Sequence, residues 1–234
     1  MKNRLEKNKD KEYSYGIKFD DIFDFAIGAL IIGILSARAY FVLFNWEYYS
    51  QNVGEIFKIW HGGIAIYGAI IGSAIYAILF CIKRKIVFLD FADLIVPYLA
   101  LAQSIGRWGN FVNQEAFGSQ TNLPWKMGIF DEITSKYIFV HPTFWYESLC
   151  TGLIAFLLIH ISKKRNFKGQ IMYLYFIFYG MARAVIEGLR TDSLMFANFR
   201  VSQILSILFV IIFGITYFRV LKSRTKESNQ YWHV

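Results

Sequence analysis

The sequence lacks the patterns that carry several common enzyme chemistries. The motifs GxSxG and HExxH do not occur in its 234 residues, and no group of His, Cys, Asp and Glu has the spacing of a zinc or magnesium site. The two cysteines, Cys81 and Cys150, fall within apolar runs, where we expect neither a disulfide nor a metal-bound thiolate. There is also no internal repeat and no nucleic-acid-binding motif.

Long apolar runs dominate what is present. Hydrophobic residues make up 56% of the chain and charged residues only 18%. Six stretches approach the length of about twenty residues that a helix needs to cross the hydrocarbon core of a membrane. They lie at about 25–44, 64–82, 91–107, 143–161, 170–188 and 201–221. The sequence therefore predicts an all-α, polytopic integral membrane protein with about six transmembrane helices.

Basic residues are placed unevenly and predict the orientation. Lysine and arginine precede the first predicted helix and follow the second, the fourth and the sixth, and the net charge is +8. The positive-inside rule then places both termini in the cytoplasm and the connections 45–63, 108–142 and 189–200 outside. We expect a single membrane domain over 1–234, with basic cytoplasmic tails at 1–24 and 222–234 and a small extracytoplasmic cap at 108–142. We expect no cleavable signal peptide, because the first 24 residues are polar and lysine-rich.

The fifth predicted helix carries ionisable residues inside its apolar run. Tyr179, Arg183 and Glu187 recur every four residues, and we expect Arg190 to lie close to the same face. An arginine at that depth costs at least about 2.5 kcal/mol unless it is paired or hydrated. One interpretation is that Arg183 and Glu187 merely neutralise each other. We favour a functional polar pocket, because an inserted pair without a role could be replaced by two leucines.

A second arginine ends the third predicted helix in the stretch GRWGNFVNQEAFG. Arg107 lies between Gly106 and Gly109, where we expect the backbone to turn or to approach another group closely. A snorkelling arginine at a helix end is the structural alternative. However, two guanidiniums at one membrane level suit a phosphate, which they bind bidentately. Further hydrogen-bonding groups of this stretch are Asn110, Asn113 and Glu115.

Two more polar clusters adjoin the outer connections. His61 and Tyr67 flank a glycine-rich segment whose GxxxG spacing is typical of close helix packing, and His61 is as readily an interfacial residue as a base. In HPTFWYE, His141 and Glu147 are candidates for proton handling or for orienting an arginine. The three aromatic residues between them are typical of a membrane-interface belt.

Together these motifs resemble the prolipoprotein diacylglyceryl transferase family of bacterial inner membranes. The matching pieces are IWHGGIAIYGAIIG, GRWGNFVNQEAFG, HPTFWYE and ARAVIEGLRTDS, in the order of the family, with SARAYFVLF upstream. The spacing GRxGNFxNxE is the most specific of them, and the resemblance extends over about residues 20 to 221.

The resemblance implies a reaction in which a diacylglyceryl group moves from phosphatidylglycerol to the thiol of a lipobox cysteine in a prolipoprotein, releasing glycerol phosphate. It implies no metal or other cofactor, no nucleic-acid partner, and a multi-pass location in the bacterial cytoplasmic (inner) membrane. The catalytic candidates are Arg107, Arg183, Tyr67, His61 and Glu115. The substrate-binding candidates are Arg107, Asn110, Asn113, Gly118, His141, Glu147, Tyr179, Glu187 and Arg190.

Two features depart from the usual pattern of the family. Tyr67 stands where many members have a histidine proposed as base, although tyrosine also occurs there. Members usually begin with a further membrane helix, whereas this sequence begins at the basic segment that follows it. The alternatives are therefore a non-catalytic remnant that binds lipoprotein or lipid, and a small membrane transporter. Transporters usually carry polar breaks near mid-membrane and repeated halves.

Overall fold

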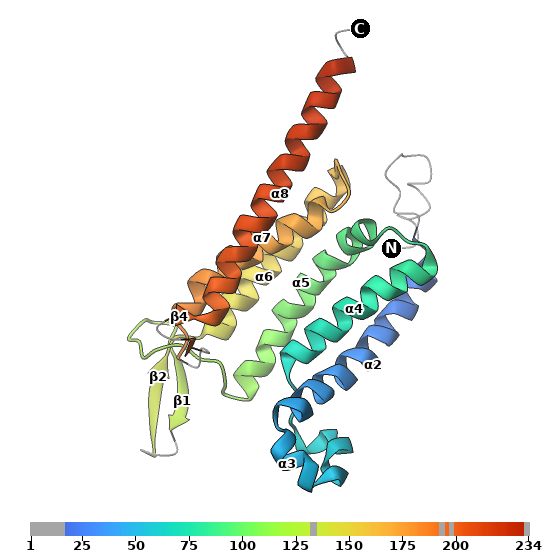
Figure 1. The fold of residues 1–234 in the computed structure, drawn as a ribbon. Helices are drawn as coiled ribbons and strands as arrows, with labels where there is room; N and C mark the ends of the chain where they lie inside the picture. The colour runs from blue at the N-terminus through green and yellow to red at the C-terminus, as the bar shows by residue number, and fades with distance from the viewer. Residues whose placement is uncertain (1–16, 132–134, 192–194, 197–198, 232–234) are drawn as a thin grey trace. The chain divides into compact units, whose positions relative to one another are not determined.

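The structure is a computed structural model that describes residues 17–131, 135–191, 195–196 and 199–231, with side chains described as far as residue 224 except at 196 and 199 (Figure 1). Most of the expected basic tail at 1–24, and part of the one at 222–234, lie outside the described side chains. The chain divides into two compact units, Met1–Phe91 and Ala92–Val234.

Six long helices occupy the six predicted stretches. They are α2 (Phe19–Phe44), α4 (Ile66–Arg84), α5 (Phe88–Val112), α6 (Thr143–Ile161), α7 (Gln170–Glu187) and α8 (Val201–Tyr231). Among the described residues, five helices are long and apolar enough to cross a membrane, and α7 is the long helix that is not counted with them. The polar residues of α7 lower its hydropathy, and two of them, Arg183 and Glu187, contribute to the candidate site described below. The prediction of an all-α membrane protein is confirmed.

The first unit is built on an antiparallel pair, α2 and α4, which lie side by side in Figure 1. Gly68 of α4 allows this close approach, since an added Cβ would lie 2.9 Å from the Cα of Ala37 on α2. The GxxxG segment therefore packs helices, as its spacing predicts. Short helices connect the pair, namely α3 (Trp46–Gln51), η1 (Val53–Phe57) and η2 (Ile59–His61).

The side chain of Arg38, on α2, fixes the connection between α2 and α4 by hydrogen bonds. Its guanidinium is buried and donates to the backbone carbonyls of Glu55 (2.5 Å) and Ile56 (2.9 Å), and to those of Gly62 (2.7 Å) and Gly63 (2.8 Å). Gly62 and Gly63 have positive φ angles of 82° and 73°, a conformation that glycine adopts without a Cβ penalty. Hydrogen bonds from one arginine therefore hold the backbone of this connection.

The second unit contains the rest of α5 and everything after it. A hairpin of β1 (Met127–Asp131) and β2 (Lys136–Val140), antiparallel with Met127 opposite Val140, lies between α5 and α6 in the sequence. After α6 come η3 (Ser162–Lys164), α7, the short strands β3 (Met195–Phe196) and β4 (Phe199–Arg200), and α8. The core is formed by α5, α6 and α7, with buried residues Val96, Ala100, Ile154, Ala155, Leu158, Ile171 and Tyr175.

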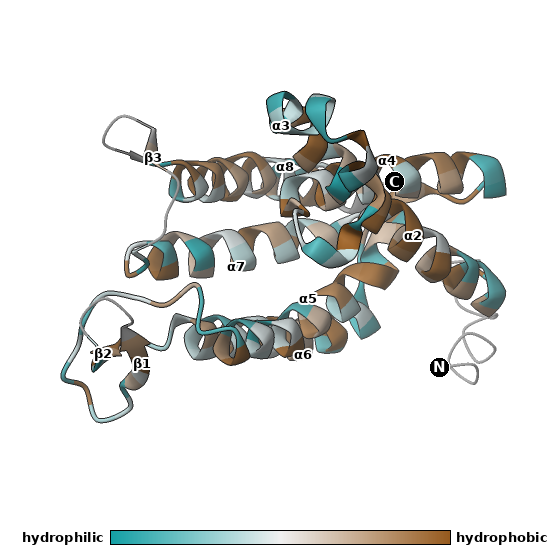
Figure 2. Cartoon of the chain, turned by 90° about the horizontal axis from the view of Figure 1, so that it is seen from below, coloured by the Kyte–Doolittle hydropathy of each residue, from teal (hydrophilic) through white to brown (hydrophobic). Residues whose placement is uncertain are grey.

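Helix α8 packs along α7 and otherwise presents apolar side chains outward. Gly180 of α7 permits the contact, because an added Cβ would lie 2.8 Å from Val210 Cγ2. Exposed residues on α8 include Ile204, Ile211 and Phe218. In Figure 2 the hydrophobic colour extends along the long helices of each unit. Exposed apolar area of this extent suits a protein surrounded by lipid.

One predicted helix end and one predicted helix face are wrong. Helix α5 does not end at Arg107 but continues to Val112, with the amide of Asn113 still bonded to the carbonyl of Gly109. The two glycines near Arg107 therefore mark no turn. Helix α7 ends at Glu187, so Arg190 lies beyond the helix face on which we predicted it and pairs as a β-bridge with Gly118. The carbonyl of Leu189 accepts the amide of Ser119 at 2.9 Å in place of a helical amide.

A buried carboxylate fixes the opposite end of the second unit. Asp93 of α5 accepts the backbone amides of Gly169 (2.7 Å) and Met172 (2.9 Å), which lie at the start of α7, and Arg165 Nη1 at 3.1 Å. Its exposed fraction is 0%. Asp93 thus caps α7 from another helix and sets the position of α7 along α5.

Replacement of Asp93 by alanine is expected to lower the stability of the protein by about 3–5 kcal/mol, because it leaves buried donors without their carboxylate. The measurement is thermal unfolding of the purified protein in detergent. Asp24→Ala is the matched control, since Asp24 pairs with Arg84 on an exposed surface, where such a pair contributes about 1 kcal/mol or less. Equal losses in the two variants would contradict the capping role.

Candidate active site

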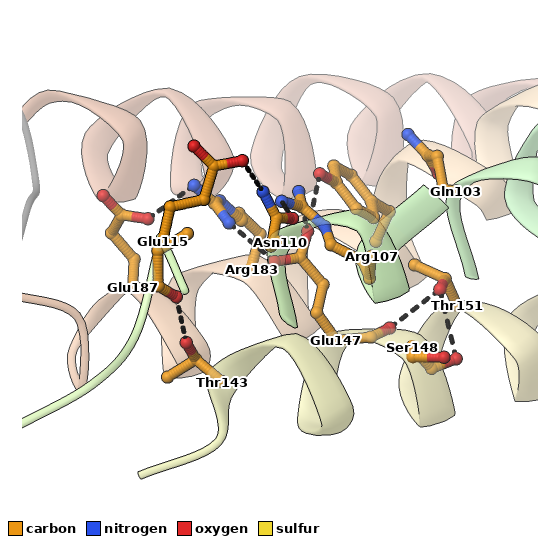
Figure 3. Close-up of polar contacts among 12 residues, drawn as sticks. Gln103, Arg107, Asn110, Glu115, Thr143, Glu147, Ser148, Thr151, Arg183 and Glu187 are labelled. Carbon is orange, nitrogen blue, oxygen red and sulfur yellow. Dashed lines mark hydrogen bonds and ion pairs between the residues drawn. The ribbon is translucent and has the colours of Figure 1, made fainter. Parts of the chain in front are cut away.

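Glu147 is the centre of the polar cluster in the second unit (Figure 3). The residue lies near the start of α6 and only 3% of it is exposed. Its carboxylate accepts Arg107 Nη2 from α5, Arg183 Nη1 from α7 at 2.8 Å, and the hydroxyl of Tyr179 at 3.3 Å. Three helices therefore converge on one carboxylate, and the two predicted arginines are neighbours.

The start of α6 positions Glu147 by local bonds on both sides. Upstream, Thr143 Oγ1 donates to the carbonyl of Ala116 and joins the helix to the loop that follows α5. Downstream, Thr151 Oγ1 donates to the carbonyl of Glu147 at 2.7 Å. The positive end of the α6 dipole favours a carboxylate in this first part of the helix.

Arg183 joins two carboxylates. In addition to Glu147, its Nη2 lies 2.8 Å from Glu187 Oε2, one turn further along α7. Arg200 donates to the backbone carbonyl of Glu187, whose exposed fraction is 1%. The predicted Arg183–Glu187 pair exists, but it is part of a cluster of two arginines and two carboxylates rather than an isolated self-neutralising pair.

A chain of amides leads from Arg107 towards the cap. Arg107 Nη1 donates to Asn110 Oδ1 at 3.2 Å, and Asn110 Nδ2 donates to Glu115 Oε1 at 2.9 Å. Asn113 Nδ2 donates to the same oxygen at 3.2 Å. The three polar residues after Arg107 are thus brought together, and Glu115 ends the chain at an exposed position.

Gly118 and His141 lie in the connection between α5 and α6, which we predict to form the cap. The amide of Gly118 donates to the carbonyl of His141 at 3.0 Å, and an added Cβ at Gly118 would lie 3.0 Å from the carbonyl oxygen of Leu189. The His141 ring lies 3.3 Å from the hydroxyl of Tyr146, which also accepts Trp125 Nε1 at 2.8 Å. Both residues lock the cap loop to the start of α6.

The arginines are more accessible than the carboxylates beneath them. The side chains of Arg107 and Arg183 are 24% and 14% exposed, against 4% for Glu147 and 2% for Glu187. A guanidinium has five N–H donors, so the hydrogen bonds to the described residues leave donors on each arginine for a further acceptor. The cluster can therefore hold an anion between two cations that are already oriented by carboxylates.

His61 and Tyr67 belong to the first unit. His61 Nδ1 lies 2.8 Å from Glu55 Oε2, and Lys58 Nζ donates to the other oxygen of Glu55 at 2.7 Å. The hydrogen bonds from Lys58 and then from His61 hold the pKa of Glu55 below its ordinary value. Tyr67 lies in the first turn of α4 and is 42% exposed. His61 lies on the connection held by Arg38, and Tyr67 follows that connection at the start of α4.

Comparison with known proteins decides the family. A family model described as prolipoprotein diacylglyceryl transferase matches residues 1–219. This chain belongs to that family. The family predicted from the four motifs is therefore confirmed.

Individual members of the prolipoprotein diacylglyceryl transferase family agree over most of their length. The phosphatidylglycerol–prolipoprotein diacylglyceryl transferase of Finegoldia magna is 49% identical over 196 residues, covering 83% of this chain and 77% of that protein. The protein of the same name from Listeria welshimeri is 47% identical over 208 residues, covering 86% and 75%. The one from Acaryochloris marina is 44% identical over 224 residues, covering 92% and 81%.

Sequence reasoning about this diacylglyceryl transferase family member missed three polar residues with structural roles. Arg38 and Asp93 fix backbone segments, and Arg200 binds the end of α7. Arg38 lies in SARAYFVLF, which is part of the family resemblance, but its carbonyl partners lie at least 17 residues away in the sequence. A charged residue inside an apolar run is the signal that could have identified Arg38 and Asp93.

Proposed function

We propose that this chain transfers the diacylglyceryl group of phosphatidylglycerol to the thiol of a lipobox cysteine in prolipoproteins, the first step of bacterial lipoprotein maturation. One observation carries the proposal: two arginines from different helices meet at a single buried carboxylate and keep N–H donors that the described residues do not occupy. The names of the relatives supply the substrates, phosphatidylglycerol and prolipoprotein.

The reaction exchanges one bond for another at a glycerol carbon of the lipid. The bond from this carbon to the phosphate oxygen breaks, a bond to the cysteine sulfur forms, the thiol proton is lost, and glycerol phosphate leaves. Negative charge gathers on the phosphate, where Arg107 and Arg183 stabilise it as preorganised donors. Neighbouring guanidiniums also lower the pKa of the attacking thiol and so favour the thiolate.

The other polar residues take supporting roles in this proposal. Glu147, Tyr179 and Glu187 orient the two arginines, while Asn110 and Asn113 hold Glu115 beside Arg107. Gly118, His141 and Arg190 shape the loop that borders the lipid head group. His61 and Tyr67 lie in the first unit, and their catalytic role stays a prediction from the sequence.

The direct test is to incubate the purified protein with labelled phosphatidylglycerol and a lipobox peptide. Thioether-linked peptide and free glycerol phosphate are the expected products. Binding of both substrates without product would favour the non-catalytic interpretation. Movement of lipid or solute across proteoliposome membranes without product would favour a transporter.

We further propose that the protein lies in the bacterial cytoplasmic membrane with both termini in the cytoplasm and the cap at 108–142 outside. Five helices that are long and apolar enough to cross a membrane, with α7 as the sixth crossing, support this proposal. Such an arrangement puts the arginine cluster at the outer membrane–water boundary.

The topology predicts opposite labelling of two exposed positions. Single cysteines replace Ser119 and Lys164 in a background that lacks Cys81 and Cys150. In intact spheroplasts, an impermeant thiol reagent is expected to label position 119 and not position 164, and to label both after permeabilisation. Labelling of 164 but not 119 from outside would invert the orientation and place the cluster on the cytoplasmic side.

A further inference from the structure

Gln103 lies one helical turn from Arg107 on α5, away from the cap. Their separation of four positions corresponds to about 6 Å along the helix axis and keeps both side chains on one face. Gln103 is half-buried, and Figure 3 shows it on the same helix as Arg107. An amide at this depth in a membrane-spanning helix needs partners, because lipid chains offer none.

One end of the Gln103 amide is fixed by a buried tyrosine. Its Oε1 accepts the hydroxyl of Tyr175 at 2.9 Å, and Tyr175 is 4% exposed. The ring of Tyr175 stacks on that of Tyr179, with centroids 5.6 Å apart and an interplanar angle of 5°. Tyr179 in turn donates to Glu147. The position of the Gln103 amide is therefore fixed relative to Glu147 and the two arginines.

The other end of the amide is free. Among the described residues, Gln103 Nε2 donates to no acceptor, whereas Gln103 Oε1 accepts the hydroxyl of Tyr175. Ser104, the next residue, differs in this respect: its hydroxyl donates to the carbonyl of Ser148 at 2.7 Å and its carbonyl accepts Ser148 Oγ at 2.8 Å. Two oriented N–H groups thus remain for an acceptor one turn below the two guanidiniums.

We propose that Gln103 Nε2 binds an ester carbonyl of the diacylglyceryl lipid and makes the site selective for ester-linked over ether-linked chains. The identity of the lipid rests on the function proposed above. In a glycerophospholipid the ester carbonyls lie a few bonds deeper than the phosphate, across the glycerol backbone. They are acceptors only, and so complement an amide whose acceptor is already occupied. An ether chain has no carbonyl and would leave the donors unpaired.

The test measures turnover of two lipids with matched chains, diacyl and dialkyl phosphatidylglycerol. Each lipid is given to the wild type, to Gln103→Leu and to the control Ser104→Ala. The wild type is expected to prefer the diacyl lipid by about tenfold in kcat/KM, the value of one hydrogen bond. Gln103→Leu is expected to lose about tenfold with the diacyl lipid alone, so that the preference disappears. Ser104→Ala, which removes a polar group satisfied by α6, is expected to retain the preference.

A second readout separates this proposal from the proposed function. Thermal stabilisation of the detergent-solubilised protein by each lipid reports binding without turnover. Product formation with no ester preference in the wild type, or an equal loss with both lipids in Gln103→Leu, overturns the subsite and leaves the transferase function intact. Preferential stabilisation by the diacyl lipid without any thioether product supports the subsite and rejects the transferase function.

Discussion

Glu147→Gln is expected to reduce thioether formation by at least about a hundredfold, because it removes the charge that holds Arg107 and Arg183 together. Glutamine keeps the size of the side chain and one acceptor oxygen, but it has no negative charge to balance the positive charges of the two guanidiniums. Loss of one preorganised electrostatic group in a protected site costs about 10²–10³ in rate. The measurement is the rate of labelled diacylglyceryl transfer to a lipobox peptide.

Ser148→Ala is the control for Glu147→Gln. Ser148 is the next residue of α6, is also buried, and bonds to Ser104 and Trp108 rather than to either arginine. We expect this variant to lose some thermal stability while its turnover stays within a few-fold of the wild type. If Glu147→Gln behaves in the same way, Glu147 is a packing residue and does not set the arginines for catalysis.

Changes at the two arginines are expected to have effects of similar size. Arg107→Lys keeps the charge but loses the planar fork that reaches Glu147 and Asn110 at the same time. Arg183→Ala removes a cation from the position where the phosphate is proposed to bind. A contact worth about 2.7 kcal/mol in the transition state corresponds to about a hundredfold in rate. We therefore expect turnover to fall by roughly a hundredfold or more in each variant.

The structure shows which control Arg183→Ala requires. This change leaves Glu147 and Glu187 with Arg107 as the remaining arginine of the cluster, and an unbalanced buried carboxylate is itself destabilising. The double variant Arg183→Ala with Glu187→Gln restores one cation for one anion. Thermal stability is expected to recover in the double variant while turnover does not. Near-normal turnover in both arginine variants would make these residues structural and reject the phosphate-binding role.

The amino-acid sequence by itself determined the six helices and the residues worth testing. Apolar runs of transmembrane length are a local property, so their existence follows from composition without knowledge of any partner. Arg107 and Arg183 stood out for the same reason, since a charge within an apolar run is costly unless it has a purpose. The order and spacing of the four motifs were also enough to predict the family.

Only the tertiary structure decided how these residues are combined. Glu147 appeared in the sequence as one candidate among several, and its place between the two arginines depends on how α5, α6 and α7 pack. The continuation of α5 through Gly106 and Gly109, and the binding of Arg38 to distant carbonyls, likewise escaped prediction. Helical periodicity gives the face on which a side chain lies, but the partner it meets depends on the distances between helices, which no local pattern encodes.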